Sequence, residues 1–128
     1  MMDVLAQGLN VIKTHKRIGR RSCVIRPSSK LLLDVLEIFK RSGYIASYEL
    51  KKDGRGDELV VNGIGPINDC GVIKPRFSVP ADDWVKWEER YILSKDFGLL
   101  IVSTSQGLMT NMEARSKNLG GRLIAYIY

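Results

Sequence analysis

The apolar positions in the first half of the chain predict a helix, a short strand and a second helix. Leu5, Leu9 and Ile12 recur at nearly helical spacing, which is typical of an amphipathic helix, and Asp3 stands at its expected start. The apolar block at 23–25 predicts a strand. The second helix is expected to begin after Pro27-Ser28-Ser29, to end at Gly43, and to bury the stripe Leu32, Val35, Leu36 and Phe39.

Two alternating segments then predict a hairpin, which completes an N-terminal lobe. Residues 44–50 and 58–61 have the composition of strands, and the turn between them is expected at 53–57. The Gly/Pro-rich stretch after Gly63 is the expected lobe boundary. We therefore expect an α/β (α+β) fold with two small lobes, 1–63 and 64–128.

The second half of the chain predicts a mostly β lobe with short helices. Pro75 and Pro80 exclude one long helix, so the segment 70–80 is expected to form two short extended pieces. Trp84, Trp87 and Tyr91 share one face of a helix that Asp82 or Asp83 would cap, and this spacing favours core packing over base stacking. Further strands are expected at 99–102 and 123–128.

A polar stretch follows the apolar strand at 99–102. Ser103, Thr104 and Ser105 stand at the end of this strand, and Gly107 permits a turn that a Cβ would hinder. Thr110 precedes Glu113 by three residues, the spacing of a helix capping box, so we expect strand, polar loop and short helix in that order. Hydroxyls and backbone N–H groups gathered in this way suit phosphate, sugar and base-edge oxygens, although Ser and Thr are also common as plain turn residues.

The charge distribution points to a polyanionic partner. The formal net charge is +6, and no acidic residue lies between Asp3 and Asp34. Seven cations occupy that interval: Lys13, Lys16, Arg17, Arg20, Arg21, Arg26 and Lys30. The first three suit the end of a helix, but the excess that continues through Arg20 and Arg21 favours phosphate contact. Nucleic acid is therefore favoured over an anionic membrane surface.

Other classes of function have little support in the residues. No apolar run approaches the roughly 20 residues that span a bilayer, and no leader pattern is found, so we expect a soluble intracellular protein. Cys23 and Cys70 are expected to be buried thiols rather than zinc ligands or a disulfide. His15 is the only histidine, and no base neighbours Ser103 or Ser105 in the sequence. We expect no catalysis, metal, cofactor or small-molecule substrate.

Three ordered motifs together resemble one known family. The pattern Ser103-Thr104-Ser105-x-Gly107-x-Met109, followed by Glu113-Ala114-Arg115 and by Gly120-Gly121, resembles the C-terminal signature of the small-subunit ribosomal protein S-eight family, called S-fifteen-a in eukaryotes. The segments 26–30 with 43–45, and 70–77, are similar to two further segments of that family. The segment 84–97 is more similar to eukaryotic and archaeal members than to bacterial ones.

The resemblance implies a two-lobe protein that binds an irregular helix in the central domain of small-subunit ribosomal RNA, beside neighbouring small-subunit proteins. It implies a place in cytoplasmic ribosomes, and in the nucleolus during assembly if the source is a eukaryote. Implied RNA contacts or supports are Ser103, Thr104, Ser105, Gly107, Glu113 and Gly121 in the C-terminal lobe, and Asp3, Ser29 and Lys30 in the N-terminal lobe. Met112 stands where many eukaryotic and archaeal members have an acid, which leaves a contact at this position open.

Arg20 and Arg21 complete the expected RNA-binding set, as contacts to the phosphate backbone. Two other interpretations compete with RNA binding. One is a basic module that docks on an acidic protein or a membrane. The other, with least support, is a small serine hydrolase that uses Ser103 or Ser105, which would need a base within hydrogen-bond reach in the fold.

Overall fold

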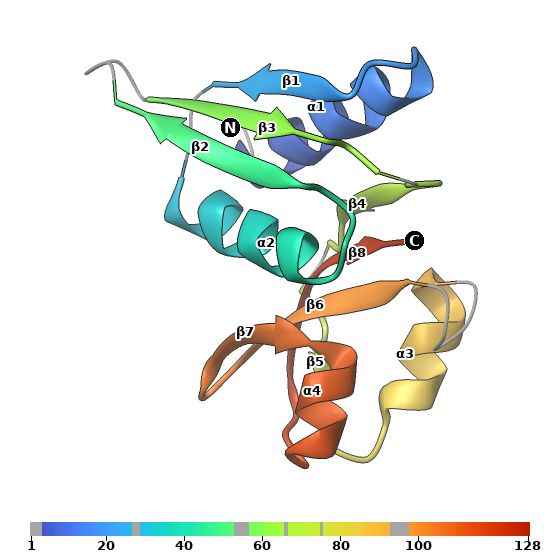
Figure 1. Ribbon diagram of the computed structural model, residues 1–128. Coiled ribbons are helices and arrows are strands. Elements are labelled where there is room, and N and C mark those ends of the chain that lie inside the picture. Colours follow the sequence, from blue (N-terminus) through green and yellow to red (C-terminus); the bar gives the residue numbers. More distant parts are fainter. Residues whose placement is uncertain (1–3, 27–28, 53–56, 66, 75, 93–97) are drawn as a thin grey trace. The chain divides into compact units, whose positions relative to one another are not determined.

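The computed structural model describes residues 4–26, 29–52, 57–65, 67–74, 76–92 and 98–128 (Figure 1). The chain divides into two compact units, Met1–Ile67 (unit 1) and Asn68–Tyr128 (unit 2). The division falls a few residues after Gly63, where the sequence suggested a boundary. Both units combine helices with an antiparallel sheet, so the predicted α+β class is confirmed.

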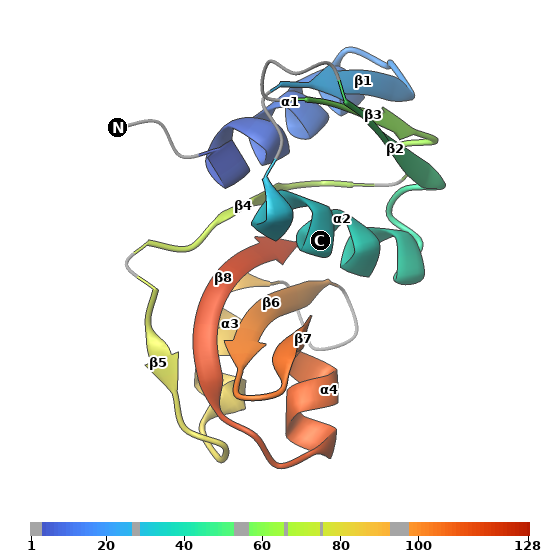
Figure 2. The ribbon, with the colours of Figure 1, turned by 90° about the vertical axis from the view of Figure 1, so that its left-hand side faces the viewer.

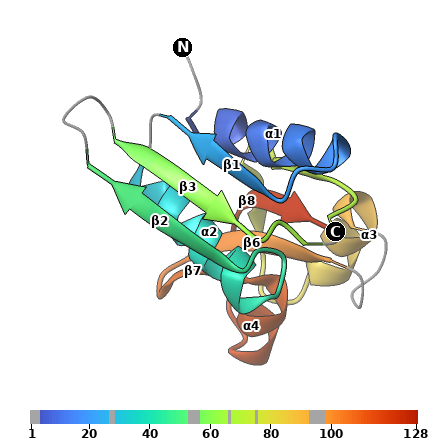
Figure 3. The same ribbon diagram turned by 45° about the horizontal axis from the view of Figure 1, so that its top comes forward.

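Unit 1 has the predicted order of helix, strand, helix and hairpin. Its elements are α1 (Val4–Arg17), β1 (Ser22–Ile25), α2 (Lys30–Arg41), β2 (Ser47–Lys51) and β3 (Glu58–Asn62). β3 lies between β1 and β2 and pairs antiparallel with both (Figure 3). Figure 2 shows α1 and α2 on the same side of this sheet. The core of the unit therefore lies between the two helices and one face of the sheet.

The ends of α2 follow from its flanking residues. Ser29 is the N-cap, and its hydroxyl accepts a hydrogen bond from the Leu32 N–H at 3.1 Å, as the sequence predicted. After the helix, Gly43 has a φ of +85°, which favours glycine, and the Tyr44 N–H donates to the Phe39 carbonyl at 2.9 Å. This closing turn uses the residues before Ser47, so β2 begins later than the predicted 44. The predicted turn at 53–57 lies mostly outside the described residues.

Unit 2 is built around the C-terminal strand. Its elements are β4 (Cys70–Val72), β5 (Ser78–Val79), α3 (Trp84–Tyr91), β6 (Leu99–Thr104), β7 (Gly107–Thr110), α4 (Asn111–Ser116) and β8 (Gly121–Ile127). The strand order is β4-β8-β6-β7, and β5 also pairs with β8 (Figure 2). The first residues of β8, Gly121 and Arg122, pair with β5, and Arg122 also pairs with β6.

The aromatic residues of α3 belong to the core, as predicted. Trp84 is 2% exposed and Trp87 is 8% exposed, and both pack in a cluster with Leu100, Val102 and Leu123. The predicted cap of this helix is wrong in one respect. Asp83 occupies the N-cap position, but its backbone is at φ −121° and ψ 30°, away from the extended conformation usual for a cap, and its side chain makes no capping hydrogen bond.

Two further expectations concern the cysteines and the membrane. Cys23 and Cys70 are buried, as expected, and they form no disulfide. Burial raises the pKa of Cys23 to about 11. Across the described ranges, no helix combines the length and apolar character needed to cross a bilayer.

Candidate nucleic-acid interface

The hydroxyl triplet 103–105 lies at the tip of a β-hairpin. β6 and β7 pair from Ile101 with Thr110 to Thr104 with Gly107, and Ser105 and Gln106 form the turn. The predicted polar loop is therefore wrong for 107–110, which form a strand. The hairpin closes because Gly107 adopts a φ of +108°, a conformation that favours glycine. A Cβ added at position 107 would meet open space, so a glycine is needed there for the turn and not for close packing.

Thr104 holds this turn together from within. Its Oγ1 donates to the Gly107 carbonyl at 2.9 Å and accepts from the Gln106 N–H at 3.1 Å. Ser103 and Ser105, on either side of it, are exposed, and within the described part of the chain their hydroxyls make no hydrogen bond. The triplet thus combines one structural hydroxyl with two that can bind another molecule.

A hollow of about 500 Å³ adjoins the hairpin tip. It is lined by Ser78, Val79, Pro80, Ser103, Thr104, Ser105, Gly120, Gly121 and Arg122. The register explains why distant segments meet there, since Arg122 on β8 lies opposite Ser78 on β5 and opposite Ser103 on β6. The hydroxyl triplet and the Gly-Gly pair are therefore parts of one surface.

The two glycines allow close approach between the strands that form this surface. A Cβ on Gly121 would lie 2.6 Å from the Ser103 carbonyl oxygen, and a Cβ on Gly120 would lie 2.5 Å from the Val79 carbonyl oxygen. Real Cβ atoms do not come so close to backbone atoms. Gly121 also lines the hollow. Its close packing against β6 is sufficient to explain why this residue is a glycine.

The short helix α4 begins with the predicted capping box. Thr110 Oγ1 accepts from the Glu113 N–H at 3.2 Å, and the same hydroxyl lies 3.4 Å from Glu113 Oε1. Glu113 is half-buried and does not line the hollow, so its position suits support of the helix start. Met112, beside it, is 56% exposed.

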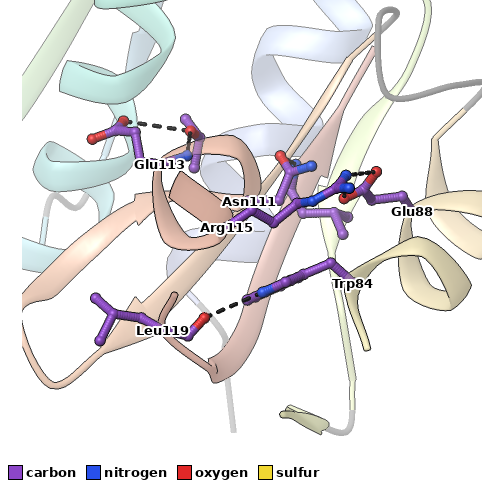
Figure 4. A network of polar contacts seen from close by, with 8 residues as sticks. Trp84, Glu88, Asn111, Glu113, Arg115 and Leu119 are labelled. Atoms are coloured by element: carbon purple, nitrogen blue, oxygen red, sulfur yellow. Dashed lines mark hydrogen bonds and ion pairs between the residues drawn. The ribbon is translucent and has the colours of Figure 1, made fainter. Parts of the chain in front are cut away.

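A polar network fixes α4 to its neighbours (Figure 4). Glu88 on α3 is only 3% exposed, and its two carboxylate oxygens accept from Arg115 Nη1 at 2.8 and 3.0 Å. Asn111 is fully buried, and its Oδ1 accepts from the Leu100 N–H at 3.0 Å. Because β7 ends at Thr110, the Asn111 side chain takes the place of the next backbone partner of β6.

A second, basic hollow lies in unit 1. It measures about 420 Å³ and is lined by Lys16, Gly19, Arg20, Arg21, Ile64 and Gly65. Arg20 and Arg21 are exposed, and the Arg20 N–H donates to the His15 carbonyl at the end of α1. None of the lining residues that the structure describes is acidic. The structure therefore brings together the two arginines predicted as phosphate contacts and adds Lys16 to them.

Ser29 and Lys30, two other predicted contacts of the N-terminal lobe, line neither hollow. Ser29 uses its hydroxyl to cap α2, and Lys30 is exposed at the first position of that helix. Asp3 lies outside the described residues. Sequence reasoning missed Ser78 and Arg122, although the position of Arg122 directly after Gly120-Gly121 could have drawn attention to it.

The serines of the hollow in unit 2 have no acid–base partner among the described lining residues. These residues include no His, Asp, Glu or Lys that could serve as a base for Ser103 or Ser105. His15 donates a hydrogen bond from Nδ1 to the Val11 carbonyl oxygen at 2.9 Å, within α1. Among the described residues, no three His, Cys, Asp or Glu side chains form a group that could hold a metal ion.

Comparison with known proteins agrees with the resemblance carried by the three motifs. Residues 3–128 match the protein family described as Ribosomal protein S8. The chain is also 45% identical over 128 residues to the small ribosomal subunit protein uS8 of Caldivirga maquilingensis, and the match covers 100% of this chain and 98% of that protein. With the family match spanning nearly its whole length, this chain belongs to the ribosomal protein S8 family.

Proposed function

We propose that this protein is a structural constituent of the small ribosomal subunit that binds an irregular helix of the central domain of small-subunit ribosomal RNA. Membership of the family supports the ribosomal role, together with a place in the ribosome beside other small-subunit proteins. The proposal includes a contribution to subunit assembly, in the nucleolus if the cell is eukaryotic. It assigns the protein no catalytic activity.

The observation that carries this proposal is the exposure of Ser103 and Ser105 at the rim of the hollow in unit 2. The deep, narrow major groove of regular A-form RNA excludes side chains, so short hydroxyls on a hairpin can reach major-groove and Watson–Crick base edges only where an RNA helix is distorted. Thr104 and Gly107 hold the tip, and Glu113 supports the adjoining helix.

The basic hollow of unit 1 has the complementary role in this proposal. Arg20 and Arg21 contact phosphates without reading the base sequence, and Lys16 adds a third positive charge. Ser29, Lys30 and Asp3 are further proposed contacts of the same unit. Specific recognition then belongs to unit 2, and salt-dependent attachment to the backbone belongs largely to unit 1.

Nuclease-protection mapping of the RNA that co-purifies with the chain tests this function. We expect one protected fragment, from an irregular helix of the central domain of small-subunit ribosomal RNA. Protection spread evenly over unrelated RNA would contradict specific recognition. Purification of a protein or vesicle complex that survives nuclease treatment would instead favour a basic docking module.

A further inference from the structure

Arg122 occupies the centre of a row of side chains that crosses three strands. Its register partners are Ser78 on β5 and Ser103 on β6, and residues directly opposite each other in antiparallel strands point to the same face of the sheet. All three side chains are exposed, and all three line the hollow of unit 2. Neighbouring strands lie about 4.8 Å apart, so the row spans about 10 Å across the sheet.

The surroundings leave the charge of Arg122 available to a ligand. Within the described ranges, its guanidinium makes no ion pair and no hydrogen bond. None of the described residues that line the hollow is acidic. The hydroxyls of Ser78 and Ser103 likewise have no partner in the part of the chain that the structure describes. One cation and two hydroxyl donors therefore face the same space, with no acidic group among them.

The chemistry of this row matches a sugar–phosphate backbone. A guanidinium presents a planar fork of N–H donors that fits two phosphate oxygens, and its positive charge strengthens both hydrogen bonds. The long Arg122 side chain reaches farther from the sheet than the two serines beside it. A phosphate at the rim of the hollow and a sugar hydroxyl nearer its floor would then be bound at different depths.

We propose that Arg122 is the phosphate-binding residue of the hollow in unit 2, and that Ser78 and Ser103 contact the adjoining sugar of the same RNA strand. This inference rests on the proposed RNA-binding function and deepens it. The hairpin tip then reads exposed base edges through Ser105, while the neighbouring row holds the backbone of that RNA in register. Unit 2 would thus carry a phosphate contact of its own.

The salt dependence of RNA binding tests this assignment. The full-length protein is titrated with the RNA fragment protected in nuclease mapping and with an unrelated duplex RNA of equal length, over a range of salt concentrations. We expect Arg122→Gln to lower the slope of log K against log salt by about one on the protected fragment, because one phosphate contact is lost. Arg122→Lys, which keeps the charge, should retain the slope.

Lys86→Gln is the matched control, because it removes one positive charge from the same unit. Lys86 lies on α3 with its Nζ 5.5 Å from the centre of the Trp87 ring, and Figure 1 shows α3 at the other end of unit 2 from the β6–β7 turn. We expect the slope of this variant to equal that of the wild type. A slope lowered equally by Lys86→Gln and Arg122→Gln, or lowered by neither, overturns the assignment.

The double variant Ser78→Ala/Ser103→Ala tests the second part of the proposal. It should weaken binding to the protected fragment while leaving the salt slope unchanged, since no charge is removed. Unchanged affinity would overturn the role of the two serines.

Thermal melting of every variant tests whether it is folded, and substitutions at exposed positions should preserve folding. A wild-type protein that binds both RNAs equally would contradict the proposed function itself, whereas the slope of Arg122→Gln on either RNA would still decide the phosphate contact.

Discussion

The three adjacent hydroxyls at the hairpin tip have different tasks, although their side chains are chemically alike. The Thr104 hydroxyl donates to the Gly107 carbonyl and accepts from the Gln106 N–H. Ser103 and Ser105 present theirs to the hollow without an internal partner among the described residues. The Ser-Thr-Ser motif therefore combines one structural hydroxyl with two that can bind another molecule, and substitutions within it should separate stability from affinity.

Alanine substitutions at Thr104 and Ser105 test this separation. Thr104→Ala should lower the free energy of unfolding by about 1 kcal/mol, because the turn loses its side-chain hydrogen bonds. Ser105→Ala should leave the free energy of unfolding unchanged and weaken binding to the specific RNA by about 1 kcal/mol, or roughly fivefold. Urea denaturation and RNA titration measure the two quantities.

Thr104→Ser is the control, since it keeps the hydroxyl that closes the turn. We expect it to retain most of the wild-type stability. Equal destabilisation by Ser105→Ala and Thr104→Ala would refute the division of tasks.

At the scale of the elements, the sequence predicted the periodic segments well and missed one short strand. The stripe of α2 and the core face of α3 were correct because several apolar residues repeat at helical spacing. The strand β7 was missed because Gly107 to Thr110 is too short to establish an alternating pattern, and its pairing with β6 depends on the positive φ of Gly107. The row of Ser78, Arg122 and Ser103 could not be predicted, since it depends on the register of three strands far apart in sequence.

The anchoring of α4 by the buried Glu88 predicts a strong coupling across two helices. The Glu88 side chain is only 4% exposed, so removing Arg115 leaves a buried carboxylate without its ion-pair partner. A double-mutant cycle with Glu88→Gln and Arg115→Met should give a coupling energy of about 2 kcal/mol in urea denaturation.

The ion pair between Arg26 and Glu58 in unit 1 is the matched comparison. Its side chains are 49% and 30% exposed, and solvent screens their attraction. The same cycle with Arg26→Met and Glu58→Gln should give less than about 1 kcal/mol. A coupling at Arg26–Glu58 as large as that at Glu88–Arg115 would show that burial does not set the strength of these pairs.

The pairing of β4 with β8 should weaken at high pH through Tyr126. Burial, the charge of Asp69 and a hydrogen bond to Asp69 at 3.3 Å raise the pKa of Tyr126 from 10.0 to about 12. The unfolded chain therefore loses this proton near pH 10, whereas the folded chain keeps it. The contribution to stability is complete below pH 10 and is lost as the pH rises towards 12.

Denaturation over this range of pH, compared between the wild type and Tyr126→Phe, measures the effect. The variant lacks the titrating hydroxyl, so its stability should fall less steeply than that of the wild type. Parallel curves would mean that Tyr126 does not carry this dependence.

At the scale of the whole molecule, part of the positive charge lies in two hollows. The net charge is +6, and the two hollows hold Lys16, Arg20, Arg21 and Arg122, with no acidic residue among the described residues of either lining. In the proposed function, two attachment surfaces on one chain would make the second RNA contact intramolecular once the first has formed, and this would raise the overall affinity.

Two double variants distinguish the effect of the basic hollow of unit 1 from the effect of the net charge of the protein. Arg20→Gln/Arg21→Gln should lower the salt slope of binding by about two on any RNA, because two phosphate contacts are lost, and should leave the preference for the specific RNA unchanged. Lys51→Gln/Lys52→Gln removes the same charge from exposed positions of the same unit outside the hollow, and should change the slope much less. If both pairs lowered the slope equally, binding would follow net charge alone. If the arginine variant lost affinity only for the specific RNA, the hollow of unit 1 would read sequence or shape, and recognition could not be assigned to unit 2.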